Sequence, residues 1–167
     1  MTPLPGHTGA AVFWRLDDKR FARTWDSGEG ARQKGGRWNA AGVPAVYCSL
    51  DPSTAILEVA VHKGFETLNS VPHVLSGAAL SVPWTDVQVV RPEDIPNTRW
   101  LYPSALSAAQ QDFGNRLLSR FSFVAIPSAV SRMSWNLVFD ASHAARKYVL
   151  QVQQDLDLDP RLNPPSR

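Results

Sequence analysis

Apolar residues occur along the chain in short runs whose length and alternation are typical of β-strands. In residues 43–49, for example, Val43, Ala45 and Tyr47 share one parity and are expected to face the same way. A proline at position 127 follows one such run and is expected to end it. The pattern predicts strands over residues 12–16, 43–49, 74–82, 87–90, 121–126, 137–139 and 148–152.

Two further segments have the signals of helices. Asp51 is a good N-cap and is followed by proline at the first helical position, so a helix is expected over residues 52–63, with Gly64 as its stop. A second helix is expected from a cap at Ser104 to Arg120. Its apolar positions share one face. They are Leu106, Ala109, Phe113 and Leu117.

The order of these elements predicts the class of fold. Strands outnumber helices and do not alternate strictly with them, which favours an α+β domain over a doubly wound sheet. Residues 26–36 hold four glycines and several charges and are expected to form a loop. The 167 residues have the length of one domain, which we assign to residues 1–167. Residues 1–10 and the tail from about Asp155 are expected to be loosely held.

The charge balance and the cysteine count narrow the class of protein. The chain has 17 Lys and Arg against 15 Asp and Glu, and a net charge of +2 argues against a general nucleic-acid binder. Cys48 is the one cysteine, so an intrachain disulfide is excluded. The sequence shows no signal-peptide pattern at its start and no apolar run near the roughly 18 residues of a membrane span. We therefore expect a cytoplasmic protein without a membrane partner.

Common catalytic motifs are missing from the sequence. There is no P-loop, no HExxH, no paired CxxC and no GxSxG. Gly28-Glu29-Gly30 begins like a dinucleotide fingerprint, but Gln33 stands where the third glycine belongs. Glu58 and His62 have the spacing of two ligands on one helix face, yet a solvated helix face explains two such residues better. We therefore expect no metal site.

The unusual stretch of the chain is Gly35-Gly36-Arg37-Trp38-Asn39, where two glycines allow close approach of the backbone and Arg37 follows at once. Tyr47 comes ten residues later, and Glu58 stands a further eleven residues on, within an apolar helical segment. Burying such a carboxylate unpaired costs several kcal/mol, so Glu58 lies either on a narrow polar edge or at a site. Each residue alone is typical of ordinary structure: a loop arginine, a core tyrosine, a solvent-facing glutamate.

Together, the order and spacing of Arg37, Tyr47 and Glu58 within the Gly-Gly-Arg-Trp-Asn frame resemble the RES domain family, which is named for Arg, Glu and Ser. The resemblance covers about residues 12–162, which we expect to be the ordered core. Asp140-Ala141 departs from the family, many members of which have Asn-Pro before the late histidine. Further matching segments are Trp14-Arg15, Gly28-Glu29-Gly30-Ala31, Val124-Ala125-Ile126-Pro127-Ser128, Asn136, His143 and Asp159-Pro160-Arg161-Leu162.

The resemblance implies a fold, an activity and partners. RES proteins resemble the ADP-ribosyltransferases, with a split, curved β-structure, flanking helices and a cleft for NAD. They are toxins of bacterial toxin–antitoxin pairs that deplete NAD by hydrolysis or phosphorolysis of the nicotinamide bond. The implied partner is an Xre-type helix-turn-helix antitoxin. Family members resemble dimers within larger assemblies, so a homodimer is expected. Direct binding of nucleic acid is not expected.

The resemblance also implies roles for individual residues, with NAD as substrate and no cofactor. Glu58 would hold a ribose hydroxyl and stabilise an oxocarbenium-like transition state. Arg37 would grip the diphosphate or the nicotinamide ribose, with Arg15 as a second phosphate contact. Tyr47 would stack on nicotinamide, and Ser128 would donate a hydrogen bond near the nicotinamide end.

Other functions remain open at this point. Water, phosphate or a protein side chain could each be the acceptor, so an ADP-ribosyltransferase acting on a protein is one alternative. A binding module that keeps the fold without catalysis is a second. An RNase-type toxin is a third, because six tryptophans could stack on bases, although core packing explains them better. The tryptophans considered for a partner surface are Trp84, Trp100 and Trp135.

Overall fold

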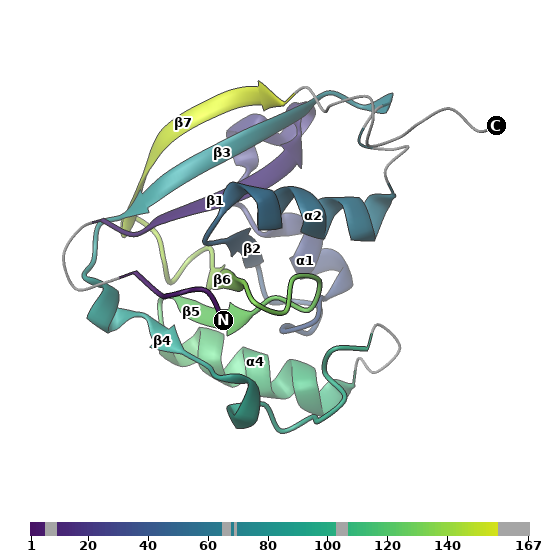
Figure 1. Ribbon diagram of the computed structural model, residues 1–167, viewed down its shortest axis with the longest axis vertical. Coiled ribbons are helices and arrows are strands. Elements are labelled where there is room, and N and C mark those ends of the chain that lie inside the picture. The colour runs from purple at the N-terminus through teal and green to yellow at the C-terminus, as the bar shows by residue number, and fades with distance from the viewer. Residues whose placement is uncertain (6–9, 65–67, 69, 103–106, 157–167) are drawn as a thin grey trace.

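The computed structural model describes residues 1–5, 10–64, 68, 70–102 and 107–156. Its strands form one mixed sheet in the order β4-β5-β6-β2-β1-β3-β7, with helices against it (Figure 1). The strands are β1 (Val12–Asp18), β2 (Ala45–Ser49), β3 (His73–Leu80), β4 (Gln88–Val89), β5 (Val124–Pro127), β6 (Trp135–Asp140) and β7 (Tyr148–Leu156). The helices are α1 (Glu29–Lys34), α2 (Pro52–Lys63) and α4 (Ala108–Arg120), with 3₁₀ turns η1 (Lys19–Thr24), η2 (Trp84–Asp86) and η3 (Pro92–Asp94).

The sheet is split between β1 and β2. β1 pairs antiparallel with β3 along its whole length, and β2 pairs antiparallel with β6 along its whole length. Between β1 and β2 the register contains one pair, Trp14 with Ser49. The two strands therefore diverge after this pair, and the sheet consists of a β1-β3-β7 half and a β4-β5-β6-β2 half.

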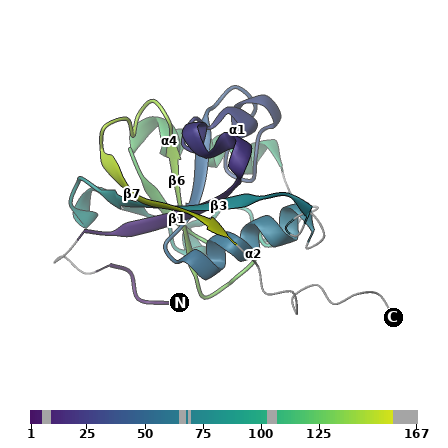
Figure 2. The ribbon, with the colours of Figure 1, turned by 90° about the horizontal axis from the view of Figure 1, so that it is seen from above.

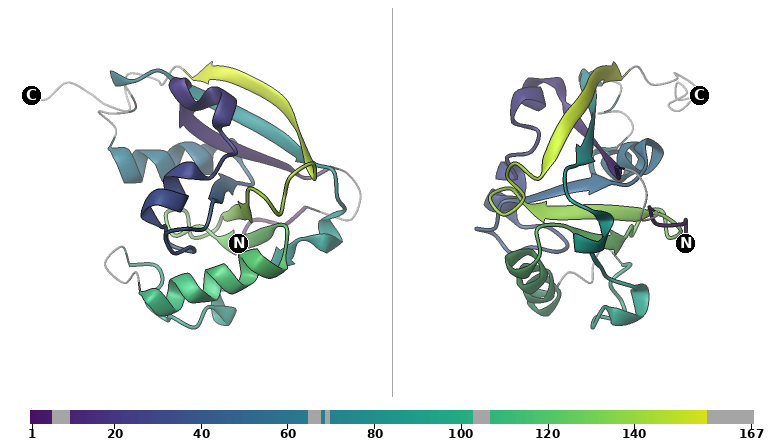
Figure 3. Two further views of the ribbon diagram at one scale, coloured as in Figure 1. Left: turned by 180° about the vertical axis from the view of Figure 1, so that it is seen from behind. Right: turned by 90° about the vertical axis from the view of Figure 1, so that its left-hand side faces the viewer.

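The helices cover different parts of this split sheet. Seen from above, α2 lies on one face of the β1-β3-β7 half and α1 on the other (Figure 2). α2 packs on both β1 and β2, α1 packs on β2, and α4 packs on β6. The view from behind shows α1 beside the diverging strands and α4 against the other half, at the bottom of the left-hand view (Figure 3). The segment between α1 and β2 therefore lies beside strands and helices, with Trp38 and Asn39 buried and Ala41 and Gly42 exposed.

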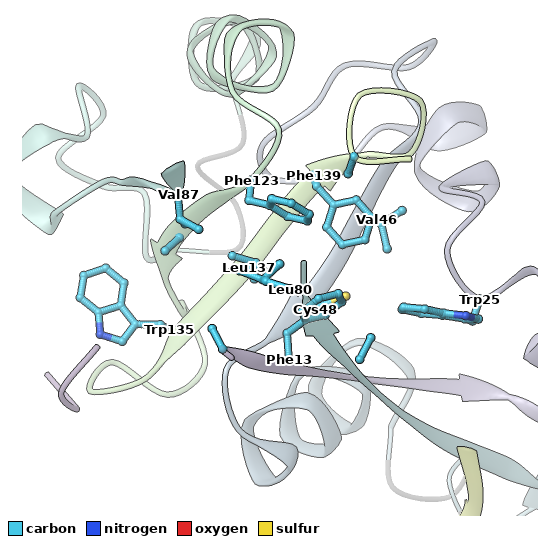
Figure 4. Packing of buried hydrophobic residues seen from close by; sticks show 14 residues of the cluster. Phe13, Trp25, Val46, Cys48, Leu80, Val87, Phe123, Trp135, Leu137 and Phe139 are labelled. Atoms are coloured by element: carbon cyan, nitrogen blue, oxygen red, sulfur yellow. The ribbon is translucent and has the colours of Figure 1, made fainter. Parts of the chain in front are cut away.

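An aromatic core joins the two halves of the sheet where backbone pairing does not. The ring of Phe13 on β1 lies 5.8 Å from that of Phe139 on β6, and Phe139 lies 5.4 Å from Phe123 (Figure 4). Tyr148 on β7 joins the group, with its ring 5.3 Å from Phe139. Its hydroxyl donates to Asp26 Oδ2 at 2.6 Å, which satisfies the polar end of a partly buried ring. Burial of these rings holds the halves together.

The predicted α+β class, with its split and curved sheet, is confirmed. The helix over residues 52–63 has the predicted bounds, and Asp51 accepts a hydrogen bond from the backbone of Thr54 at 2.8 Å. Trp100 and Trp135, which were considered for a partner surface, are buried in the core, and Trp84 is half-buried against it. The predicted strand over residues 121–126 is shorter, and β5 begins at Val124.

The prediction of a loop over residues 26–36 was wrong, because α1 occupies Glu29–Lys34. Two of the four glycines stand at the ends of this helix, with Gly28 at φ 65° and Gly35 at φ 72°. Between them, Glu29 bonds both Arg32 and Gln33, the i,i+3 and i,i+4 partners that stabilise a helix. Glycines that cap a helix were mistaken for glycines of a loop.

The inward face of α4 also differs from the prediction. Ser107 caps the helix, and Ser104 lies outside the described residues. The buried positions are Gln110, Gly114 and Leu118, whereas Phe113 and Leu117 are only half-buried. The reason is the close approach of the backbone at Trp38, since a Cβ at position 114 would lie 2.0 Å from the Trp38 carbonyl oxygen. Glycine, and not a large apolar residue, is what this contact requires.

Both ends of the described chain are held more firmly than the sequence predicts. The backbone N–H of Thr2 donates to Met133, and the Thr2 carbonyl accepts from the Trp135 indole at 3.0 Å. β7 continues to Leu156, four residues past its predicted end. Residues 157–162 of the expected core lie outside the described residues.

The contact between α4 and Trp38 gives a test with a matched control. We expect Gly114→Ala to lower the free energy of unfolding by about 2 kcal/mol or more, because its Cβ meets backbone. Gly30→Ala in α1 meets no atom within 4 Å and is expected to stabilise by about 0.5–1 kcal/mol. Urea unfolding of both variants measures this. Equal effects at both positions would contradict the packing described here.

Candidate active site

A cleft of about 1040 Å³ opens where β1 and β2 diverge. Its walls come from β1, η1, α1, β2 and α2, with the glycine-rich segment 35–38 along one side and the start of β6 at another. Clefts that bind small molecules commonly have about 300–1,000 Å³, so this one has room for a dinucleotide. Arg15, Arg37, Tyr47 and Glu58 all line it.

Glu58 projects from α2 and is held at one of its two carboxylate oxygens. Oε1 accepts a hydrogen bond from Ser128 Oγ at 2.7 Å and another from Asn136 Nδ2 at 2.7 Å. Oε2 lies 3.7 Å from Nε2 of the exposed His62. With its side chain 20% exposed, Glu58 presents one fixed carboxylate to the cleft.

The two donors to Glu58 are themselves oriented by neighbouring groups. Ser49 Oγ donates to Asn136 Oδ1 at 2.8 Å, so the amide nitrogen of Asn136 faces Glu58. The fully buried Ser128 hydroxyl accepts from the backbone N–H groups of Val130 and Ser131 at 3.2 and 2.9 Å. Its single proton is therefore directed to Glu58. The ends of β2, β5 and β6 and the helix α2 converge on this carboxylate.

Arg37 extends from the glycine-rich segment and is half-buried. One guanidinium nitrogen, Nη1, donates to the backbone carbonyl of Trp100. Burial lowers the pKa of Arg37 from its ordinary value, while the nearby Glu58 acts to raise it. A guanidinium has five N–H donors, so Arg37 can bind the Trp100 carbonyl and an anion in the cleft at once.

Tyr47 closes the glycine-rich segment onto β2. Its hydroxyl donates to Asn39 Oδ1 at 2.6 Å and accepts from the backbone N–H of Trp38 at 3.0 Å. Gly36 packs so closely that a Cβ there would lie 2.6 Å from the Tyr47 hydroxyl. Burial raises the pKa of Tyr47, so the phenol is neutral at ordinary pH. The hydroxyl is thus committed to the protein, while the residue still lines the cleft.

Arg15 spans the split in the sheet. Its Nη1 donates to the Tyr47 carbonyl at 2.7 Å, and its Nε lies 3.0 and 2.9 Å from the two carboxylate oxygens of Asp17. Burial acts to lower the pKa of Arg15, but the Asp17 carboxylate raises it, and the net pKa is above the ordinary value. Arg15 is therefore a charged side chain that connects β1 to β2.

The structure brings the predicted residues together and adds several that sequence reasoning missed. Glu58 and Ser128 are in direct contact, and Arg37 and Tyr47 line the same cleft. Asn136 was noted only as a family match, and its bond to Glu58 was not foreseen. Asn39 anchors Tyr47, and its place within the glycine-rich frame is the signal that could have revealed it. Within the described ranges, no group of three or more His, Cys, Asp or Glu could hold a metal ion.

The split sheet and the cleft walled by arginine, tyrosine and glutamate define a single-domain α+β protein with a candidate site at the divergence of two strands. The chain belongs to the RES domain family, because the family's sequence profile matches residues 12–160. The resemblance drawn from the sequence is therefore confirmed. None of the described helices is long and apolar enough to cross a membrane.

Several individual proteins are similar to this chain over most of their length. The chain is 32% identical to "Toxin Res" of Pseudomonas putida over 154 residues, which cover 90% of this chain and 99% of that one. It is 28% identical to "Toxin Res" of Photorhabdus laumondii, covering 90% and 96%. It is 30% identical to the "Prs ADP-ribosylating toxin" of Sphingobium sp., covering 81% and 85%.

A solved structure shares the fold. A chain of the M. tuberculosis MbcT–MbcA toxin–antitoxin complex superposes with a TM-score of 0.70, covering 92% of this chain and 87% of that chain. The two sequences are 21% identical, so this likeness concerns the fold.

The hydroxyl of Tyr47 gives a test of how the site is built. We expect Tyr47→Phe to lower the free energy of unfolding by about 1–3 kcal/mol, because Asn39 and the Trp38 N–H lose a buried partner. Tyr102→Phe is the control, since Tyr102 is 56% exposed, and a change within about 0.5 kcal/mol is expected. Thermal and urea unfolding compare the two. A Tyr47→Phe protein as stable as the parent would show that the phenol does not hold the segment.

Proposed function

We propose that this chain is a toxin that cleaves the N-glycosidic bond between nicotinamide and ribose in NAD. The observation that carries the proposal is Glu58, whose carboxylate is fixed by Ser128 and Asn136 in the wall of a dinucleotide-sized cleft. The "Toxin Res" relatives support the toxin class. The cleft residues support the chemistry.

The reaction needs little acid–base help, which suits a site with one carboxylate held in place. The nicotinamide of NAD is cationic, so when the C–N bond breaks, its electron pair moves to the ring nitrogen and nicotinamide leaves neutral. The ribose carbon becomes oxocarbenium-like and positive. Glu58 stabilises that charge and binds a ribose hydroxyl, and a preorganised group of this kind is worth about 10²–10³ in rate. Water that bonds to this carbon releases a proton to solvent, whereas phosphate bonds to it through an oxygen that is already ionised.

The remaining residues bind the substrate and orient Glu58. Arg37 binds the diphosphate or the nicotinamide ribose through donors that the Trp100 carbonyl leaves unused. Tyr47 presents a ring for nicotinamide while its hydroxyl stays with Asn39. Ser128 is a positioning residue for Glu58, because its hydroxyl proton is donated to that carboxylate. Arg15 reaches a phosphate only in competition with Asp17.

A second candidate is transfer of ADP-ribose to a protein. The relative named as an ADP-ribosylating toxin favours it, because the same bond is broken and only the acceptor differs. Water or phosphate needs only a small space beside the ribose, whereas a protein acceptor must dock at the mouth of the cleft. The acceptor is therefore a separate question from the breaking of the bond.

We also propose that an antitoxin neutralises the protein. The shared fold with a chain of the MbcT–MbcA complex supports such a partner. That it is of the Xre type and that the toxin is a homodimer follow from the family resemblance, and the cytoplasmic location follows from the sequence pattern; all three stay predictions.

The central test is nicotinamide release from NAD, followed by chromatography with and without added phosphate. Glu58→Gln is expected to lower turnover by about 10²–10³ while leaving the unfolding temperature nearly unchanged, since the amide oxygen still accepts from Ser128 and Asn136. Glu93→Gln removes an exposed carboxylate in η3, outside the cleft, and should keep the activity of the parent.

The outcomes separate the candidates. Release by the parent that grows with phosphate identifies phosphorolysis, and release without phosphate identifies hydrolysis. Release that requires an added protein, with ADP-ribose on that protein, supports the second candidate. A fully active Glu58→Gln protein would remove Glu58 from the mechanism.

A further inference from the structure

One buried side chain, Gln110 of α4, joins the two segments that hold Arg37. Its Nε2 donates to the backbone carbonyl of Arg37 at 3.3 Å, and its Oε1 accepts from Asn97 Nδ2 at 2.6 Å. The residue is 2% exposed, so these bonds are made in the interior. Both ends of the amide are used, one on each segment.

The second segment carries the carbonyl that binds the Arg37 guanidinium. Asn97 folds a turn in which its own carbonyl accepts from the Trp100 N–H at 3.0 Å and its Oδ1 accepts from the Arg99 N–H at 3.0 Å. The indole of Trp100 is buried against Trp38, with ring centroids 5.9 Å apart. This turn therefore fixes the Trp100 carbonyl to which Arg37 donates.

The neighbouring residue, Gln111, also binds the backbone of the glycine-rich segment. Gln111 Nε2 donates to the Gly36 carbonyl at 3.0 Å, so two successive residues of α4 bind the backbone carbonyls immediately before and after the Arg37 side chain. Gln110 alone of this pair also reaches the Asn97 turn.

The position of Gln110 in the sequence suggests a different use. Ser107 is the N-cap of α4 and accepts from the Gln110 N–H at 3.2 Å, so Ser107-x-x-Gln110 has the pattern of a capping box. In that motif the glutamine side chain turns back to the N-cap backbone. Here it instead bonds Asn97 and Arg37, away from the cap. Helix capping does not account for this buried amide.

We propose that Gln110 is a positioning residue for Arg37 in substrate binding. By tying the Arg37 backbone to the turn that receives its guanidinium, Gln110 holds a long, flexible side chain in the orientation that an anion in the cleft requires. The inference rests on the proposed function, in which Arg37 binds NAD. It predicts a loss of substrate affinity and not of the chemical step.

The test uses the full chain and two variants that break the link in different ways. Gln110→Met keeps length and volume but removes both bonds. Asn97→Asp keeps the acceptor for Arg99 but cannot donate to Gln110, and turning the Gln110 amide over would place its oxygen against the Arg37 carbonyl. Gln88→Met is the control, because Gln88 is half-buried and bonds a backbone carbonyl of β4.

Each link variant is expected to raise the KM for NAD about tenfold with kcat changed less than about threefold, and the control to change neither. When each link variant is combined with Glu58→Gln, calorimetry should show the same loss as a weaker affinity for NAD. With Arg37→Ala also present, Gln110→Met should cost less than about twofold more, because the effect passes through Arg37. Unfolding temperatures show whether each variant is folded.

Three results would overturn the proposal. An unchanged KM and affinity in folded Gln110→Met and Asn97→Asp proteins, beside an active parent, would remove Gln110 from substrate binding and leave the proposed function standing. A full additional loss on top of Arg37→Ala would show a merely structural role. A parent that neither binds nor cleaves NAD would overturn the proposed function, and this inference with it.

Discussion

The architecture depends on the guanidinium of Arg15, which connects β1 and β2 where the two strands are no longer paired through their backbones. β1 and β2 share one backbone pair and then separate, and beyond that pair Arg15 reaches across from β1 to the Tyr47 carbonyl. Asp17 fixes the other side of the guanidinium. A side chain spans more distance than a backbone hydrogen bond, so the strands stay connected while the cleft opens between them. The aromatic core around Phe13 and Phe139 holds the two halves together behind the cleft.

The second constraint is the Glu58 carboxylate oxygen Oε1, which accepts two hydrogen bonds. Its donors come from Ser128 after β5 and Asn136 on β6, whereas Glu58 itself stands on α2, which packs against β1 and β2. A carboxylate bound in this way offsets its desolvation with charge-assisted hydrogen bonds. It also links α2 to the half of the sheet that carries β5 and β6. The hydrogen bonds of Glu58 with Ser128 and Asn136 therefore both orient the candidate catalytic carboxylate and connect α2 to the sheet.

Much of this could be predicted from the sequence, and the misses have physical causes. The helix over residues 52–63 was found with its bounds because Asp51, Pro52 and Gly64 are local signals. α1 was missed because Gly28 and Gly35 act as caps, which composition cannot distinguish from a loop. The partners of Glu58 lie 70 and 78 residues away in the chain, so only the family resemblance pointed toward them.

The two arginines expected to bind phosphate differ in a way that only the structure shows. The charge of Arg15 is paired with Asp17, whose side chain is 10% exposed, so a phosphate would have to displace a partly buried ion pair to reach it. Arg37 instead donates to a neutral carbonyl, and burial lowers its pKa without cancelling its charge. Glu58 opposes that lowering through space. In the proposed reaction, an anion entering the cleft therefore gains most at Arg37, and the cation and the carboxylate act on opposite charges of one substrate.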